Sequence, residues 1–229
     1  GYTTVFIDAD GQANGTYALG LPKAPGVYNL LVRPNDDGKW EKVLQPSRTP
    51  NLYVVQGNEE TFNIADRIKE TSFMRRLQQI KDWADFVVFD LSPSFTKIHQ
   101  AAVNAADYII IPSDAEPFGA LNGVDRAIEA VNESNEMREL AGLEVAEIMG
   151  VIVNKVERNN LHEAILNALN DKGVPIVEVI PKRIDLVYAA VSYQSIFEYN
   201  PALDAAQKIQ NVVDLLIAKM QESRAKEGQ

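Results

Sequence analysis

The chain contains no cysteine, only two histidines and no long run of apolar residues. Without cysteine it can form neither a disulfide nor a thiolate metal site, which fits a reducing compartment. Its apolar runs are shorter than the roughly 20 residues that cross a bilayer, and its N-terminus lacks the pattern of a signal peptide. We therefore expect a soluble, cytoplasmic protein that makes no membrane contact.

Positive charge is also scarce. The 229 residues carry 32 acidic and 22 basic side chains, for a formal net charge of −10. Such a chain is not covered with nucleic-acid contacts, although a local basic patch is compatible with it. His99 and His162 lie in helical segments without metal-ligand spacing, so we expect both to be structural or solvent-facing. No Gly-x-Ser-x-Gly motif supports a serine hydrolase.

The rest of the composition, 46% hydrophobic and 24% charged, is that of an ordinary globular protein. This length predicts a single domain over residues 1–229, with the polar stretch 221–229 as a flexible tail. The prolines between residues 20 and 50 predict an excursion with short helices around 27–32 and 40–44.

Strand-like and helix-like segments alternate along the chain. Runs rich in Val, Ile and Phe predict strands covered on both faces, at 4–8, 52–56, 86–90, 108–111, 148–153 and 176–180. Helical spacing of apolar residues occurs at 62–80, 95–104, 119–132, 161–170 and from 202 to about 220. This order predicts an α/β fold with a doubly wound, mostly parallel sheet and helices on both of its faces.

Acidic residues follow two of these runs. Asp8 and Asp10 stand around the end of the first strand, and Asp90 ends the strand 86–90. Because parallel strands end at one edge of a sheet, where ligands bind, we predict that these carboxylates lie at such an edge. Carboxylates there suit Mg²⁺ with a phosphate-bearing partner. Alternatively, the same residues only satisfy turn amides or cap the next helix.

Polar residues also follow two later strands. Asn154 comes after the strand 148–153, where its amide can read a purine or simply form a turn. Pro181, Lys182 and Arg183 hold the same place after the strand 176–180. They can form a base pocket or meet phosphate groups.

Taken in order, these segments resemble the ParA/MinD family of deviant Walker ATPases, especially its ParA (Soj-like) partition branch. VFIDADGQANGTYALG, residues 5–20, is similar to the second acidic motif, usually Asp-x-Asp-Pro-Gln, with Gly11 in place of the proline. VVFDLSPS, residues 87–94, is similar to the Walker B strand and the turn after it, with Ser92 in place of a proline. GVIVNKV at 150–156 and the segment 174–201 resemble the adenine-side and C-terminal parts. The resemblance spans nearly the whole chain and implies a P-loop NTPase-like three-layer sandwich.

The resemblance also implies roles for individual residues. Asp10 would be catalytic, because it would orient the water that attacks the γ-phosphate of ATP. Asp8 and Asp90 would hold Mg²⁺ or its waters. The residues around the adenine would be Asn154, Pro181 and Arg183.

Family members dimerise when ATP is bound, and ParA-type dimers then bind DNA without sequence preference. By resemblance, this protein would be a nucleoid-associated homodimer that contacts DNA through Lys182 and Arg183. A ParB-like or cargo adaptor protein would be its partner. The cycle of ATP binding and hydrolysis would then drive partition or positioning of a plasmid, a chromosome or another cargo.

One element of the family is absent from the sequence. Residues 1–229 contain no Lys-Gly-Gly-x-Gly-Lys-Thr loop, whose amides and lysines cradle the phosphates. Gly1 and Tyr2 resemble the residues that follow the first helix of the family. We expect a fragment of an ATPase in which the N-terminal strand, phosphate loop and helix are missing. The alternative is a non-catalytic ParA-like interaction module that has lost nucleotide binding.

Overall fold

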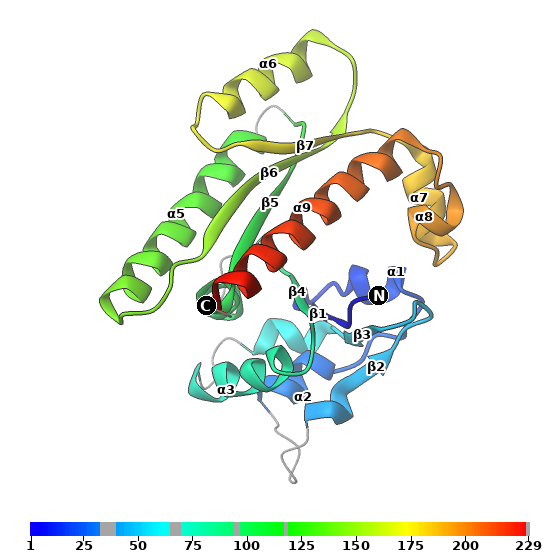
Figure 1. Ribbon diagram of the computed structural model, residues 1–229. Coiled ribbons are helices and arrows are strands. Elements are labelled where there is room, and N and C mark those ends of the chain that lie inside the picture. Colours follow the sequence, from blue (N-terminus) through cyan, green and yellow to red (C-terminus); the bar gives the residue numbers. More distant parts are fainter. Residues whose placement is uncertain (33–39, 65–69, 94–96, 117–118, 228–229) are drawn as a thin grey trace. The chain divides into compact units, whose positions relative to one another are not determined.

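The computed structural model describes residues 1–32, 40–64, 70–93, 97–116 and 119–227 (Figure 1). The chain divides into two compact units, Gly1–Ala106 and Asp107–Gln229. Each unit has its own parallel strands and its own hydrophobic core. Each is therefore described by itself.

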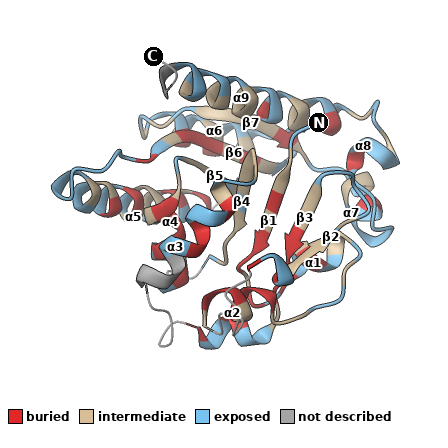
Figure 2. Ribbon diagram, turned by 60° about the horizontal axis from the view of Figure 1, so that its bottom comes forward, coloured by how far each residue is buried: buried red, intermediate tan, exposed pale blue. Residues whose placement is uncertain are grey.

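The sheet of the first unit is centred on strand β1 (Thr4–Asp8). β3 (Leu52–Val55) and β4 (Phe86–Asp90) flank β1, and both run parallel to it. β2 (Leu44–Pro46) adds an antiparallel edge strand beside β3. β1 is buried along most of its length (Figure 2), as its apolar sequence predicts for a central strand.

Helices complete the first unit. They are α1 (Asn14–Ala18), α2 (Gly26–Leu31), the 3-10 helices η1 (Trp40–Val43) and η2 (Glu59–Asn63), α3 (Glu70–Lys81) and α4 (Lys97–Ala105). Ile80 and Ile98 of α3 and α4 join Val27 of α2 and Ile7 of β1 in one core cluster. Burial of each such side chain stabilises the folded state by about 1.5–3 kcal/mol.

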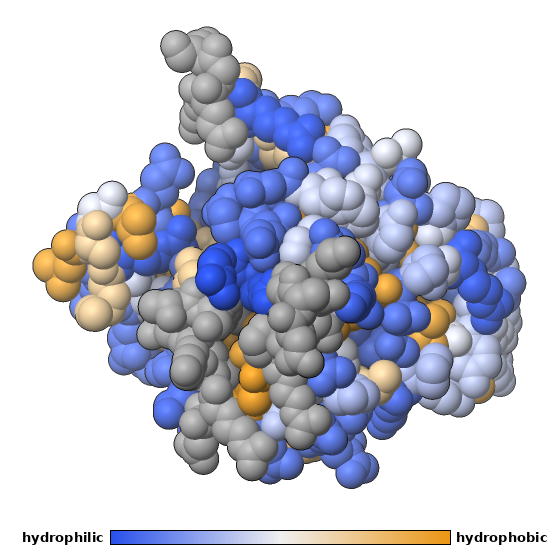
Figure 3. Space-filling view, turned by 90° about the horizontal axis from the view of Figure 1, so that it is seen from below, coloured by the Kyte–Doolittle hydropathy of each residue, from blue (hydrophilic) through white to orange (hydrophobic). Residues whose placement is uncertain are grey.

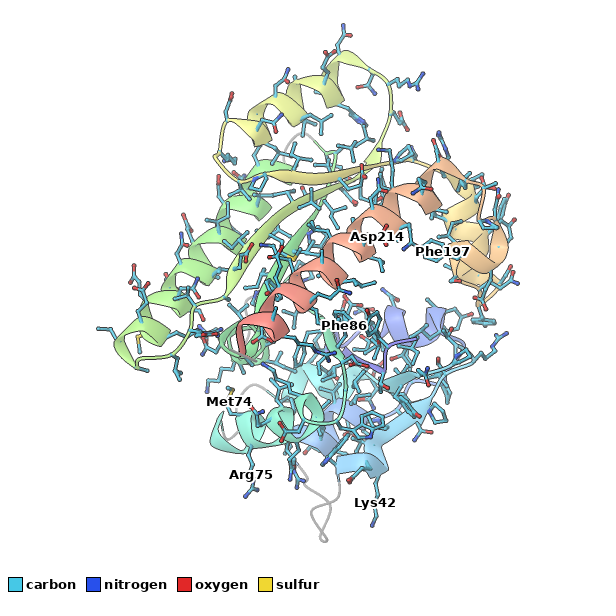
Figure 4. The ribbon with its side chains drawn as sticks, viewed as in Figure 1. Lys42, Met74, Arg75, Phe86, Phe197 and Asp214 are labelled. Atoms are coloured by element: carbon cyan, nitrogen blue, oxygen red, sulfur yellow. The ribbon has the colours of Figure 1, made fainter. Side chains whose placement is uncertain are left out.

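Aromatic rings pack edge-on against one another at two places in the first unit. The ring of Trp83 meets Tyr53 and Trp40 edge-on, with centroids 4.9 Å and 5.7 Å apart. Phe86, labelled on β4 in Figure 4, meets Tyr2 edge-on at 5.4 Å. Edge-to-face pairs of this kind add about 0.5–1.5 kcal/mol beyond their buried area.

The second unit contains three parallel strands in the order β5 (Tyr108–Asp114), β6 (Glu147–Val156) and β7 (Ile176–Pro181). Its helices are α5 (Ala120–Leu140), α6 (Asn160–Asn170), α7 (Ile184–Val191), α8 (Ile196–Tyr199) and α9 (Asp204–Glu227). Val151 and Val153 of β6 pack with Val124 of α5 and Leu169 of α6. α9 packs along β7.

The register of the second sheet shifts around Gly150. This glycine has φ 137°, and a Cβ on it would lie 2.2 Å from the carbonyl oxygen of Pro175. Only glycine fits such a close approach in this backbone conformation. The irregularity is therefore fixed by the residue type.

Large apolar side chains are exposed around the C-terminal end of α5. Met137 and Leu140 are 67% and 84% exposed, and Leu143 and Val145 follow in the next turn. Figure 3 shows hydrophobic side chains gathered at this end of the helix. No helix among the described residues has the length and apolarity that a bilayer crossing requires.

The predicted α/β class with parallel strands and helices on both sides is confirmed, and every predicted strand is present. α5 is longer than the predicted 119–132, and α7 and α8 were not predicted. The predicted helix 62–80 begins with the 3-10 turn of η2, and residues 65–69 of it lie outside the described residues, as do 95–96 of the helix 95–104. Residues 221–227 continue α9, and the flexibility of 221–229 stays a prediction.

Candidate functional site

The carboxyl edge of the first sheet brings the predicted acidic residues together. Asp8 and Asp90 end the neighbouring parallel strands β1 and β4 and are direct register partners. The backbone amide of Ala9 donates to the carbonyl oxygen of Asp90 at 2.9 Å, so the two strand ends stay joined beyond the ladder. Asp10 follows at the start of the turn that leads to α1.

Asp8 is fully buried and firmly held. Its Oδ2 accepts hydrogen bonds from the backbone amide and from the hydroxyl of Thr16, both at 2.6 Å. Oγ1 of Thr16 in turn accepts from the amide of Gly57 at 3.0 Å. Thr16 is also fully buried, so one hydroxyl links the carboxylate of β1 to the segment that follows β3.

The other oxygen of Asp8 is different. Oδ1 is buried and has no hydrogen-bond partner among the residues that the structure describes. A buried carboxylate oxygen without a donor is costly, and such atoms in native proteins are usually satisfied by water or an ion. The atom therefore fits a cation or its bound water.

The environment of Asp90 shows that negative charge is concentrated at this sheet edge. Burial, followed by the charges of Asp8 and Asp10, raises the pKa of Asp90 to about 6. Like charges disfavour ionisation of a neighbouring carboxyl, whereas a cation would offset this effect. Within the described ranges no three acidic or histidine side chains form a complete metal site. The two carboxylates at neighbouring strand ends are compatible with Mg²⁺, which uses one or two carboxylates and completes its shell with phosphates and water.

Asp10 has a more open position. Its Oδ1 accepts a hydrogen bond from the backbone amide of Gln12 at 2.9 Å. A hydrogen bond to a turn amide is the alternative role that the sequence allowed for this carboxylate. Ala13 ends this turn with φ 52°, in the left-handed region. The bond to Gln12 orients the Asp10 carboxylate without burying it.

Gly57 lies against this turn with no space for a side chain. A Cβ at this position would be 2.6 Å from the carbonyl oxygen of Asp8 and 3.0 Å from that of Asp10. Sequence reasoning missed Gly57 and Thr16. The distances along the chain, 41 residues from Thr16 to Gly57, leave no local pattern that would pair them.

The second unit has a carboxyl edge of its own. Asn154 of β6 pairs in register with Asp114 of β5, and Pro181 of β7 pairs with Val156. Nζ of Lys155, a residue with φ 56°, donates to Asp114 at 2.5 Å. This edge therefore carries an amide, a carboxylate and a proline at the ends of adjacent strands.

The two basic residues predicted to contact DNA are both ion-paired here. Nζ of Lys182 donates to Glu157 at 2.6 Å. The guanidinium of Arg183 donates to Asp204 at the start of α9. These exposed pairs raise the pKa of Arg183 and lower the pKa of Asp204 and of Glu157.

The predicted residues thus form two groups. Asp8, Asp10 and Asp90 lie together in the first unit. Those at the edge of the second unit are Asn154, Pro181, Lys182 and Arg183. In open α/β folds, ligands bind at the carboxyl ends of the parallel strands, where both groups lie.

Comparisons with known proteins give the family of this chain and agree with its α/β fold. A family model described as an AAA domain matches residues 1–141. The chain belongs to this family, in its ParA/MinD type.

Among the relatives, the maintenance of carboxysome distribution protein A of Gloeothece citriformis is 26% identical over 153 residues, which are 65% of this chain and 57% of that protein. The sporulation initiation inhibitor protein Soj of Bacillus subtilis is 25% identical over 200 residues, 83% of this chain and 72% of Soj. Cyanothece McdA has a similar fold, with a TM-score of 0.79 at 21% identity for its apo structure, which covers 94% of this chain and 88% of McdA. An ATP complex of a McdA variant gives 0.78 at 20%, covering 94% and 85%. These structural likenesses establish the P-loop NTPase-like fold.

Proposed function

We propose that this protein is a ParA-type ATP hydrolase whose nucleotide cycle positions a plasmid, a chromosome or another cargo. The observation that carries the proposal is the cluster of Asp8, Asp10 and Asp90 at adjacent strand ends, in a chain of the ParA/MinD type. The relatives named Soj and McdA, and the ATP complex of a McdA variant, support the choice of nucleotide and of cellular task.

In this proposal Asp8 and Asp90 hold Mg²⁺ or its waters. When bound, the ion supplies positive charge that offsets the charge of the phosphates. Thr16 keeps the Asp8 carboxylate fixed through two hydrogen bonds, and Oδ1 of Asp8 stays available. Preorganisation of this kind matters because phosphoryl transfer depends on positioning and charge compensation.

Asp10 is the proposed catalytic residue. Its carboxylate would accept a hydrogen bond from the attacking water and hold that water in line with the γ-phosphate. The half-buried position of Asp10, near the buried Asp8, suits contact with a solvent molecule. Asn154, Pro181 and Arg183 are proposed to surround the adenine.

The test is the variant Asp10→Ala in the full-length protein. We expect it to bind ATP with wild-type affinity but to turn over about 10²-fold more slowly, because only the positioning of water is lost. Asp214→Ala, which removes an exposed carboxylate of α9, serves as the control and should keep wild-type turnover (Figure 4). Unchanged turnover in Asp10→Ala would remove this residue from the mechanism.

We further propose an ATP-bound homodimer in the cytoplasm that binds nucleoid DNA without sequence preference and meets a ParB-like or cargo adaptor. The names of two relatives, which refer to carboxysome distribution and to chromosome partitioning, support this task. The alternative is a non-catalytic ParA-like interaction module that has lost nucleotide binding. Full-length protein that fails to bind ATP would establish the alternative.

A further inference from the structure

Phe62 is an aromatic residue whose position core packing does not explain. It lies in η2, and 52% of its surface is exposed. Its ring lies directly against Gly11, the residue that follows Asp10. A Cβ on Gly11 would lie 2.5 Å from Cε2 of the ring and 2.6 Å from Cδ2 and from Cζ. The ring therefore occupies the space of a side chain at position 11.

Gly11 does not need to be glycine for its own backbone. Its φ lies outside the positive range in which four other glycines of the described chain are found, Gly20, Gly142, Gly150 and Gly173. The ring of Phe62 crowds a Cβ there, since all three atoms nearest to that position belong to it. Glycine is also the most flexible residue, so a ring packed against Gly11 adds a restraint to the hydrogen bonds within the turn after Asp10.

The segment that carries Phe62 is itself well anchored. Asn58 caps η2 by accepting from the amide of Glu60 at 3.1 Å, and the amide of Thr61 donates to the carbonyl oxygen of Asn58 at 2.9 Å. One residue earlier, Gly57 donates to Thr16 and lies against the carbonyl oxygens of Asp8 and Asp10. Residues 57–62 thus touch the turn of Asp10 at both ends, through Gly57 on one side and Phe62 on the other.

We propose that Phe62 is a positioning residue that acts on Asp10 through Gly11. By filling the space beside Gly11, the ring limits the backbone of the turn and keeps the Asp10 carboxylate in one orientation. This inference rests on the proposed function, because it assigns a role in the reaction to the orientation of Asp10. It adds a residue outside the acidic cluster to the determinants of turnover.

The contact can be tested without nucleotide by a double-mutant cycle on thermal unfolding. Gly11→Ala alone should lower the midpoint by about 5 °C, because the new methyl group meets the ring. In a Phe62→Ala background the same Gly11→Ala change should lower it by less than about 1 °C, because the space is then open and the unfolded chain is restrained. Equal effects of Gly11→Ala in both backgrounds would show that the two residues are independent and would overturn the proposal.

The role in turnover needs a second measurement on full-length protein. Phe62→Ala should lower kcat about 10-fold with KM for ATP changed less than about 2-fold, since an orientation effect appears in the chemical step. Phe62→Leu, which still covers Gly11, should recover most of that loss. A purely structural role would leave kcat of the folded Phe62→Ala protein at the wild-type value, and this result would overturn the proposal.

The outcomes also separate this inference from the proposed function. Slow turnover in Asp10→Ala together with normal turnover in Phe62→Ala would leave the function standing and remove Phe62 alone. Normal turnover in Asp10→Ala would instead remove the catalytic assignment, and the role of Phe62 would fall with it. The thermal cycle reports the contact in either case.

Discussion

At the scale of single residues, the acidic edge of the first sheet stores unfavourable charge. Asp8 is buried with one oxygen lacking a donor among the described residues, and Asp90 has a pKa raised to about 6 by burial and by its acidic neighbours. Stability is therefore given up at the place where a ligand is proposed to bind. Functional sites often combine burial and like charges in this way.

The Asp90 pKa predicts a pH-dependent stability. Because the folded pKa lies above the ordinary value of 3.8, folded protein binds more protons than unfolded chain between pH 3.8 and about 6. Stability should therefore fall as pH rises through this window. Asp90→Asn removes the effect, so it should stabilise the protein at pH 7.5 by about 1 kcal/mol, after allowance for solvent screening, and by much less at pH 4.

Urea unfolding at both pH values measures this difference. Asp214→Asn, at an exposed position of α9, is the matched control and should show no such pH-dependent gain. Equal stability of Asp90→Asn and wild type at pH 7.5 would contradict the expected cost of ionising Asp90.

The acidic residues of the site could be predicted from the sequence, whereas their supports could not. Asp8, Asp10 and Asp90 follow apolar runs, and such runs end at a common sheet edge by a local rule. Thr16, Gly57 and Phe62 act through tertiary contacts between β1 and the segment after β3. Those contacts depend on how the two segments meet in the folded sheet, and no periodic pattern encodes this.

At the scale of elements, strands were easier to predict than helices. The strands read as continuous apolar runs, which few other structures produce. The expectation that both faces are covered is wrong for β4, where Val88 is 43% exposed. α5 continues to Leu140 although its last turns bear Met137 and Leu140 on the solvent side, so the apolar periodicity ends before the helix does. α7 was missed because Ile184 and Val187 are apolar and yet exposed, which gives no clear helical face.

The bulge in β6 leads to a prediction at this scale. Gly150→Ala should destabilise the protein by about 3 kcal/mol, because the methyl group meets the Pro175 carbonyl and the positive φ is strained. Gly123→Ala in α5 is the control, since nothing lies within 4 Å of a Cβ there, and alanine should stabilise the helix by about 0.5–1 kcal/mol. Urea denaturation of both variants gives the comparison. If Gly150→Ala is as stable as Gly123→Ala, the close contact between position 150 and the Pro175 carbonyl is contradicted.

At the scale of the whole molecule, an acidic protein is proposed to bind an acidic polymer. The net charge of −10 opposes this, so binding must depend on a few local cations. Lys182 and Arg183 are candidates, but each is already paired with a carboxylate. These exposed pairs are weak, since such pairs are typically worth about 0–1 kcal/mol, and DNA phosphates can compete for the cations.

This leads to an expected salt dependence. Full-length protein with ATP should bind DNA of unrelated sequences about equally, and its affinity should fall as salt rises. Lys182→Ala should weaken binding to all sequences alike and reduce the slope of log affinity against log salt by about 1. Lys172→Ala, which removes a lysine paired with Asp125, is the control. Absence of DNA binding in a gel-shift assay at low salt would count against the partition branch.

The link from Asp8 through Thr16 to Gly57 has a consequence for how this sequence can change over time. Three separate stretches of chain meet at one carboxylate, one hydroxyl and one position with no room for a methyl group. A substitution of Asp8, Thr16 or Gly57 removes a hydrogen-bonding group or the space on which the other two residues depend. Genetic drift should therefore leave these three positions untouched or replace them together, while the neighbouring exposed residues diverge independently.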